Sequence, residues 1–531
     1  MLSLKAKRVT AKILAVLVCA LSITVVPGCR EKTETTEKQT KNSFTYWCNM
    51  PAGIVSVYQS MGEVKMYQQL EKETGIHIDF IHPAAGQASE QFTLMMAARE
   101  FPDFIEYNWG VYAGGAEKAL EDKVIIKLND LFETNAPNAK KMIESNENYQ
   151  RLSKTDSGAY FCFPALNTGS YRIFGGPIIR KDWLDELSLS VPETISEWET
   201  VLRAFKDKKG ASAPFTGDAS LMSSSGLTNA FNTAFDVGKG LFIRDGKVKF
   251  GPLEDGYREW LKLMNKWYEE GLIDNEYNTN SSSAIDAKVA NGYTGAFFGY
   301  VGGSIGKYLT MMKETEPAFD LVGVPYPVMN KGEQANFAAI ESDVLAGAAL
   351  AITTACEDPE TAAKWADYWY TEKGRMLSSF GVEGETYNLV DGKPVYTDTI
   401  LKSPEGYSMS EMLQQHCRAA AASPGFNTED EYLEQYYEYD QQKDAFKTWS
   451  SVTDHARKHL MPAITPTLDE SEEFAALSTD INTYVAEMVF KFVCGTESMD
   501  NYQTFIDGLK GMGVERYLEI NQAAYERYLK R

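Results

Sequence analysis

The sequence predicts an α/β protein with at least two hydrophobic cores, and three observations carry that prediction. A strand, a helix and a second strand follow one another over residues 44–80, the pattern of a βαβ unit with parallel strands. Strand patterns and helix patterns then keep alternating until the tail, which is helical. The chain has 531 residues, enough for two or three domains with large cores.

The first unit is clearly punctuated. Residues 44–48, Phe-Thr-Tyr-Trp-Cys, predict a short apolar strand. The helix that follows ends at Gly75, because glycine supplies the left-handed C-cap. Apolar and polar residues alternate from Ile76 to Phe80, which is the period of a strand. The stretch "FPDFIEYN" at 101–108 predicts the next strand, after another helix.

The middle and the tail continue the same alternation. Residues 166–183 begin with an aromatic and glycine-rich stretch and continue as a predicted strand. Thr194 and Glu197 then form a capping box, which predicts a helix over 191–206. The other predicted elements are a hairpin with an Asp-Gly turn at 244–251, a helix at 256–273, a strand with a glycine turn at 292–303, a strand with prolines at 321–327, a helix with a glycine loop at 358–387, and two tail helices over 481–492 and 514–531.

The N-terminus has the pattern of an export signal. Four basic residues precede a run of about fourteen mostly apolar residues, which is too short for a bilayer span of ~20 residues. The end of the run, Val26-Pro27-Gly28-Cys29, resembles the lipobox of bacterial lipoproteins, in which the cysteine becomes the acylated N-terminus. Residues 30–43 contain no hydrophobic side chain and predict a flexible tether. A true membrane anchor is the alternative, and the length of the apolar run argues against it.

The net charge excludes one class of partner. The chain carries −22, and −26 without the four basic residues of the leader. A strongly acidic surface repels nucleic acid, so no nucleic-acid partner is expected. Seven cysteines occur at wide spacing, and the five after Cys29 predict small buried side chains rather than a disulfide framework.

No motif for catalysis or metal binding is found in the sequence. The five histidines are scattered, and neither His-Glu-x-x-His, Cys-x-x-Cys nor Gly-x-Ser-x-Gly occurs. The glycines of "GYVGGSIGK" fit neither a P-loop nor a dinucleotide fingerprint, so they indicate a tight turn. Paired carboxylates for glycoside hydrolysis stay open, because their separation is spatial and sequence spacing does not reveal it.

The chain resembles the family 1 extracellular solute-binding proteins of bacterial ABC importers, in the large lipoprotein subgroup typical of Firmicutes. The resemblance rests on segments that follow one another over nearly the whole chain after the tether: "LEKETGIHIDF", "FPDFIEYN", "IIRKDWLDELSLSVPETISEW", "GYTGAFFGY", "GVEGETYNLVDGKPVYTD", "INTYVAEMVFKFVCG" and "GLKGMGVERYLEINQAAYERY".

The resemblance implies a type II periplasmic-binding-protein fold, with two hinge-linked α/β lobes and a central ligand cleft. Its three crossings would lie around Pro164, around Pro325 and at 381–387, where prolines or glycines cluster. The expected organisation is a signal peptide at 1–28, the lipidated Cys29 and tether at 29–43, a first lobe at 44–164 plus 328–382, and a second lobe at 165–327 plus 383–531.

The resemblance also implies a sugar as ligand, which sets what the site must offer. A sugar presents apolar C–H faces and a rim of hydroxyls, so its cleft needs aromatic platforms and polar groups that accept and donate. In an open α/β sheet the ligand binds where strands end. The residues that meet both conditions are Trp47, Asn49, Asn108, Trp109, Tyr171, Phe298, Tyr300, Glu341, Glu383 and Tyr387, with Tyr112, Asp343 and Glu385 beside them.

Each of these residues also has a structural interpretation. The tryptophans and Phe298 fit a core, Tyr387 fits hinge packing, and Glu341 and Glu385 fit a solvated surface.

The expected function is that of a lipid-anchored protein on the extracellular face of the membrane, without cofactor, metal or catalytic residue, that delivers an oligosaccharide to an ABC permease. The alternatives are an extracellular carbohydrate-active enzyme and a surface sensor or binding protein without a transport role.

Overall fold

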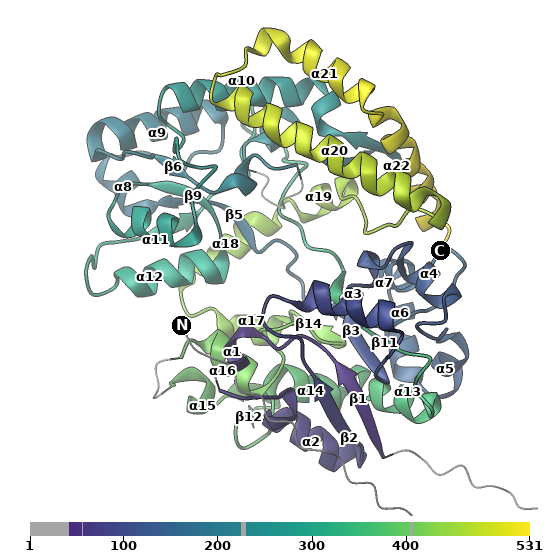
Figure 1. The fold of residues 1–531 in the computed structure, drawn as a ribbon. Coiled ribbons are helices and arrows are strands. Elements are labelled where there is room, and N and C mark those ends of the chain that lie inside the picture. The colour runs from purple at the N-terminus through teal and green to yellow at the C-terminus, as the bar shows by residue number, and fades with distance from the viewer. Residues whose placement is uncertain (1–41, 56, 225–229, 404–406) are drawn as a thin grey trace, which may run out of the picture. The chain divides into compact units, whose positions relative to one another are not determined.

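The computed structural model describes residues 42–55, 57–224, 230–403 and 407–531, which all belong to one compact unit, Lys41–Arg531 (Figure 1). The expected signal peptide and Cys29 lie outside the described residues. Within the described part of the chain, no helix combines the length and the apolar character that a membrane span needs.

A six-stranded sheet organises the first lobe. Its strand order is β14-β4-β11-β3-β1-β2. The predicted βαβ unit is confirmed, because β1 pairs in parallel with β2 and α2 joins them. β11 lies antiparallel between β3 and β4, although it comes from far along the chain. The bounds are β1 Ser43–Trp47, β2 His77–Ile81, β3 Phe104–Tyr107, β4 Phe163–Asn167, β11 Val344–Ile352 and β14 Gly425–Asn427.

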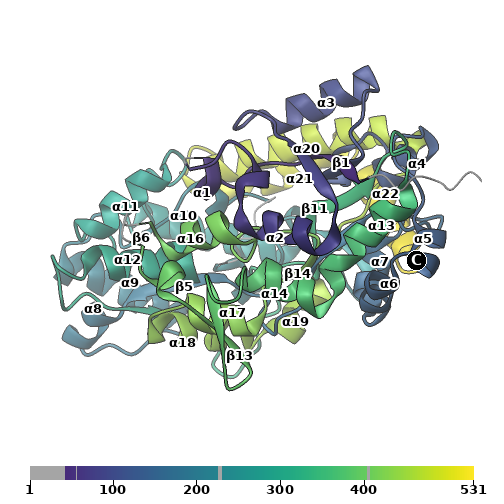
Figure 2. The same ribbon diagram turned by 90° about the horizontal axis from the view of Figure 1, so that it is seen from below.

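Helices cover both faces of this sheet. In Figures 1 and 2, α5 and α6 lie beside α13, while α3 lies on the other side of β1. The hairpin β12–β13 packs through Tyr396, whose hydroxyl donates to the carbonyl of Ser379. The bounds are α1 Ala52–Val55, α2 Lys65–Thr74, α3 Ala88–Ala98, α4 Gly115–Glu121, α5 Asn129–Thr134, α6 Pro137–Glu144, α7 Glu147–Ser153, α13 Pro359–Asp367, α14 Glu372–Phe380, β12 Tyr387–Val390, β13 Lys393–Tyr396, α15 Asp398–Leu401, α16 Met409–His416 and α17 Asp430–Tyr436.

A four-stranded sheet of order β10-β5-β9-β6 organises the second lobe. The predicted capping box of Thr194 and Glu197 starts α9, and the predicted Asp-Gly turn joins β7 to β8. The long tail helix α20 packs against α10, as Figure 1 shows. The bounds are β5 Gly175–Arg180, α8 Lys181–Glu186, α9 Ile195–Lys209, β6 Phe215–Thr216, β7 Leu241–Arg244, β8 Lys247–Phe250, α10 Asp255–Glu269, α11 Ser282–Ala290, β9 Ala296–Tyr300, α12 Lys307–Met312, β10 Leu321–Gly323, α18 Asp440–Ser450, α19 Thr453–His459, α20 Leu468–Val493, α21 Tyr502–Gly511 and α22 Val514–Tyr528.

The molecule has more than one core, as the sequence predicts, and the second sheet lies between two of them: Ile179 and Ala296 face one core, and Ile178 and Phe297 face the other. One core surrounds Trp198, Trp260 and Trp267 in the second lobe. Another surrounds the first sheet and continues along the crossings to Trp449 on α18. A smaller cluster on the α3 side of the first sheet includes Trp47 and Trp109.

The chain crosses between the lobes at three places, and the expectation for the third is wrong. The first crossing, 168–174, follows β4, next to the predicted Pro164. The second reaches the first lobe at 340–343, somewhat after the predicted Pro325. The third is 437–439, between α17 and α18.

The expected third crossing at 381–387 stays inside the first lobe, and so do residues 388–403 and 407–436. β14 pairs in parallel with β4, which fixes this segment to the first sheet. Gly381 and Gly384 have φ of 83° and 82°. These two glycines therefore supply the positive φ angles of the turn into the β12–β13 hairpin. The expected boundary at 383 therefore does not divide the lobes.

Candidate ligand-binding cleft

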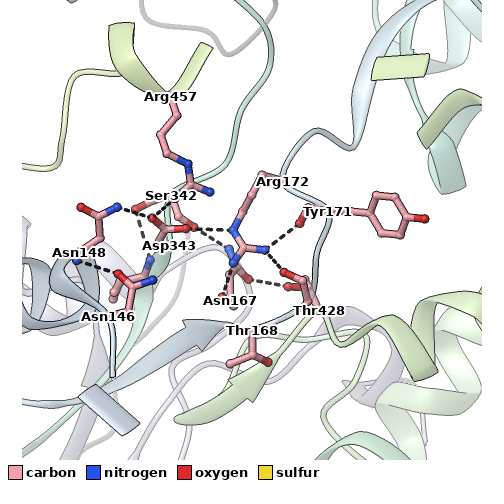
Figure 3. Close-up of polar contacts among 12 residues, drawn as sticks. Asn146, Asn148, Asn167, Thr168, Tyr171, Arg172, Ser342, Asp343, Thr428 and Arg457 are labelled. Atoms are coloured by element: carbon pink, nitrogen blue, oxygen red, sulfur yellow. Dashed lines mark hydrogen bonds and ion pairs between the residues drawn. The ribbon is translucent and has the colours of Figure 1, made fainter. Parts of the chain in front are cut away.

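A polar junction holds the first two crossings together (Figure 3). Ile173 and Ile340 form an antiparallel bridge, and the N–H of Glu341 donates to the carbonyl of Arg172 at 2.8 Å. The Arg172 guanidinium is buried and turns back onto its own segment. It donates to the carbonyls of Asn167, at 2.6 Å, of Gly169, and of Tyr171, at 2.9 Å. The first crossing is therefore a rigid, internally bonded turn.

Asp343 connects this turn to both lobes. Its carboxylate accepts from Nε of Arg172 at 3.0 Å, from Nδ2 of Asn148 on α7 at 2.7 Å and from Nη1 of Arg457 on α19 at 2.7 Å. α7 belongs to the first lobe, and α19 packs on β7 of the second. A buried ion pair is stable only when its remaining polar atoms are bonded, and this one meets that condition. Asp343 is thus a hinge residue, with its carboxylate fully engaged.

Two hollows open beside the crossings. The larger, of about 690 Å³, has walls from both lobes: Asn108, Trp109 and Phe161 on one side, and Thr465, Pro466 and Arg527 on the other. The smaller, which we call the hinge hollow, has about 280 Å³ and is lined by Phe174, Glu341, Tyr432, Tyr436, Tyr437 and the stretch 419–422, among others. Residues 344 and 346 line the first and residue 345 lines the second, because successive strand residues face opposite ways.

Glu341 is the charged group of the hinge hollow. It is half-buried, and burial raises the pKa of its carboxyl, with the charge of Arg172 acting in the opposite direction. Around it, the rings of Tyr436 and Tyr437 lie 4.8 Å apart, and Tyr437 also contacts Phe446 at 4.8 Å. The hollow therefore offers aromatic faces next to one carboxylate, the combination that a sugar ring needs.

Three predicted site residues lie near the hollows with partly open side chains. Tyr300 ends β9 with 46% of its side chain exposed, and its hydroxyl lies in the field of Glu341, which together with burial raises the pKa of Tyr300. Tyr171 packs its ring on Phe446 at 4.6 Å and is half-buried. Phe298 is half-buried with its ring edge-on to Tyr300.

The two predicted tryptophan platforms face the core instead. Trp109 is 1% exposed and donates from Nε1 to the carbonyl of Ala349 at 3.2 Å, although its edge reaches the larger hollow. Trp47 is 4% exposed and packs on Phe92 and Tyr107. Both rings fill the space between the sheet and α3, so neither presents a free face.

The remaining predicted residues are dispersed. Asn108 lines the larger hollow, but its Oδ1 accepts from the N–H of Gly110 at 2.9 Å as a helix cap. Asn49 is exposed and lines neither hollow. Glu383 and Tyr387 lie at the β12–β13 hairpin, where Tyr387 is buried against Phe380. They lie there because 381–387 is not a crossing.

Sequence reasoning missed the aromatic wall of the hinge hollow. Phe174 comes from the first crossing and Tyr437 from the third, while Tyr432 and Tyr436 lie on α17, the helix that leads into the third crossing. The sequence prediction had placed that crossing at 381–387. The segment "YLEQYYEYD" at 432–440 carries a signal that could have found it, because four tyrosines in nine residues exceed what one helix face buries. Among the described residues, no group of three or more His, Cys, Asp or Glu side chains is placed to hold a metal ion.

Comparison with known families decides the class of this two-lobed chain. The family model described as bacterial extracellular solute-binding protein matches residues 59–376. The chain belongs to this family.

Two relatives agree with the assignment. The fructooligosaccharide ABC transporter substrate-binding protein FusA of Streptococcus pneumoniae is 24% identical over 485 residues, 88% of this chain and 87% of the relative. Lipoprotein LipO of Bacillus subtilis is 22% identical over 387 residues, covering 70% and 73%.

Solved structures of solute-binding proteins share the fold. The alginate-binding protein AlgQ2 superposes with a TM-score of 0.70 at 24% identity, covering 92% of this chain and 98% of that one. An HMO-binding, ABC-transporter-associated solute-binding protein from Bifidobacterium longum infantis gives 0.75 at 19% identity, covering 92% and 99%. The two-lobed type II α/β architecture expected from the sequence is thereby confirmed.

Proposed function

We propose that this solute-binding protein captures an oligosaccharide between its lobes and delivers it to an ABC importer, from a lipid anchor at Cys29 on the outer face of the membrane. The observation that carries the proposal is the family match across both lobes, together with the aromatic and carboxylate lining beside the crossings. The names of the relatives FusA and AlgQ2 refer to oligosaccharide and alginate binding, which supports a carbohydrate as the ligand class.

The ligand class is tested by a thermal-shift screen over a panel of oligosaccharides, with amino acids and short peptides as the contrasting panel. A ligand that binds only the folded state stabilises it by about 2.7 kcal/mol at a hundredfold excess over Kd. We expect at least one oligosaccharide to raise Tm and no peptide to do so. Incubation with the same glycans should release no new reducing ends; their appearance would support an enzyme instead.

The anchor is tested separately with Cys29→Ser in the native host. The leader and the polar tether on either side of Cys29 motivate the substitution. One acyl chain gives marginal membrane binding and two or more give a stable anchor, so loss of the acylated residue should release the protein. We expect Cys29→Ser to be exported and found in the medium, whereas the wild type sediments with membranes. Sedimentation of both proteins alike contradicts the anchor.

A further inference from the structure

The hinge hollow is lined by a carboxylate that the described residues leave without a hydrogen-bond donor. Within the described part of the chain, the Glu341 side chain makes neither a hydrogen bond nor an ion pair, whereas Asp343, on the same crossing, accepts from three donors. The backbone of Glu341 is fixed by its bond to Arg172, so the side chain is held at the wall of the hollow. A half-buried charge without donors costs free energy that a ligand can recover.

The groups that face Glu341 leave it as an acceptor. The positive charge of Arg172 acts on Glu341, but the guanidinium donates to Asp343 and to the carbonyls of its own turn. Tyr300 from β9 and Tyr437 from the third crossing are the titratable groups on its other sides, and both are neutral below pH 10 because burial raises the pKa of each hydroxyl.

Two further polar side chains of the hollow, Asn427 and Thr428, are already engaged. Asn427 donates to the carbonyls of Ser423 and Gly425 and accepts from the N–H of Ser423. Thr428 donates from Oγ1 to Oδ1 of Asn167 at 2.8 Å. The remaining walls are aromatic rings and the alanines at 419–422. A ligand in the hollow therefore meets apolar and aromatic surface, neutral hydroxyls and one carboxylate.

We propose that the hinge hollow takes an uncharged sugar ring whose hydroxyls donate to Glu341, and that Glu341 discriminates against sugars bearing a carboxylate or a sulfate. Hydroxyl donors form charge-assisted hydrogen bonds to a carboxylate, which are about twice as strong as neutral ones. An anionic substituent brings a like charge into a partly desolvated space and supplies no donor. This inference rests on the proposed oligosaccharide-binding function and assigns its substrate class.

The test compares wild type, Glu341→Gln and a control on matched neutral and acidic glycans. Glu434→Gln is the control, because Glu434 is exposed on α17, the helix that carries Tyr432 and Tyr436. The probes are nystose, maltotetraose and cellotetraose against tetragalacturonate and an alginate tetramer, by calorimetry. We expect wild type to prefer a neutral probe, Glu341→Gln to bind that probe about tenfold more weakly, and Glu434→Gln to match wild type.

The pH profile adds a readout that a merely structural role would not move. Affinity of wild type for the neutral probe should fall on acidification, as Glu341 gains a proton at a pH above the ordinary glutamate range, and Glu341→Gln should show no such fall. Preference of wild type for an acidic glycan, or equal affinity of Glu341→Gln and wild type, overturns the inference while the oligosaccharide function stands. Failure of every glycan, in these probes and in the wider screen, overturns the function and the inference together.

Discussion

Asp343 and Glu341 lie two residues apart on one crossing, yet their carboxylates have opposite surroundings. Asp343 is bonded to side chains from both lobes, which makes it a fixed point of the hinge. Glu341 lines the hollow, and no donor from residues 42–55, 57–224, 230–403 or 407–531 reaches its carboxylate. In an extended strand, side chains two residues apart point to the same side. Glu341 and Asp343 do not, because the last bridged residue is Ile340, which pairs with Ile173, and the chain after it is no longer a regular strand. Spacing alone could not have told the two acids apart.

Lys239 is a second buried charge, and it predicts a pH dependence of stability. Its Nζ donates to the carbonyls of Ser220, at 2.7 Å, and Leu221, at 3.3 Å. Burial lowers the pKa of Lys239 to about 7, with the charge of Asp218 acting the other way. Between pH 7 and about 10 the unfolded chain binds a proton at this lysine that the folded chain does not. The free energy of unfolding should therefore rise with pH over this window.

We expect Lys239→Met to remove that rise. Wild type should gain on the order of 2–3 kcal/mol from Lys239 between pH 7 and pH 9.5. Lys447→Met is the control, because Lys447 is exposed beside Asp444 on α18. Urea unfolding at the two pH values measures the difference for each variant. Equal pH slopes in wild type and Lys239→Met would show that Lys239 is not held in a low-dielectric site.

Trp109 and Tyr300 are predicted to respond differently to truncation. Trp109→Ala removes a ring that is 1% exposed, so it should cost about 3–5 kcal/mol of stability. Tyr300→Ala removes a ring that is 46% exposed, so stability should change little, while sugar affinity should drop by about 1–3 kcal/mol. Each variant is measured by unfolding and by titration with the glycan that the screen returns. A large stability loss in Tyr300→Ala would show that its ring belongs to the core.

At the scale of elements, local pattern located strands and helices well but not their distant partners. The βαβ unit, the α9 capping box and the β7–β8 turn are all read from residues close in sequence. β11 and β14 join the first sheet from far along the chain, which no local period encodes. The same reason explains the misplaced third crossing: Gly381 and Gly384 give equal signals for a hinge and for a tight turn.

The segment 409–427 is predicted to depend on one buried ion pair for its place on the first lobe. Arg418 donates from Nη2 to Oε1 of Glu106 at 2.7 Å and from Nη1 to the hydroxyl of Tyr67 at 2.8 Å. Both charged side chains are almost fully buried, at 3% and 7% exposed. Tyr46 donates to the other oxygen of Glu106 at 2.6 Å, which completes the network on β3.

We expect Arg418→Met to destabilise the protein by about 3–5 kcal/mol, because it leaves Glu106 charged and buried without its cation. Combining it with Glu106→Gln should recover a large part of the loss, since the second change removes the orphaned charge. Urea unfolding of the two single variants and the double variant gives the coupling energy. Additive losses would mean that the pair does not hold this segment.

At the scale of the whole molecule, the two-lobed architecture was accessible from the sequence, but the cleft lining was not. Family-like segments run from Leu70 on α2 to the last helix, so the resemblance covers both lobes. The lining depends on which way side chains turn at strand ends. Trp109 follows β3 as predicted, yet its indole donates to the carbonyl of Ala349 and only its edge reaches the larger hollow. Side-chain direction there is set by tertiary packing, which sequence period does not report.

Lobe closure should be controlled by contacts on the rim of the larger hollow. Asp156, from the loop before β4, pairs with Arg527 at 2.6 Å and with Arg531 at 2.6 Å, so it links the first lobe to the end of α22. Arg531 is 7% exposed, but the side chains of Asp156 and Arg527 are each 25% exposed. Water and salt therefore reach the shared carboxylate, and we assign the two pairs about 1 kcal/mol in total. That is enough to shift an open–closed equilibrium about fivefold.

We therefore predict that Asp156→Asn opens the free protein and weakens ligand binding a few-fold without touching the ligand. Small-angle scattering should show a smaller radius of gyration for wild type at saturating glycan than without it, because the lobes rotate about 168–174, 340–343 and 437–439. Asp156→Asn should have a larger radius than wild type without glycan and the same radius at saturation. Asp444→Asn, an exposed change on α18, is the matched control and should reproduce wild type. If saturating glycan leaves the radius of wild type unchanged, closure about these crossings is wrong, and the rim pairs act only as static contacts between the lobes.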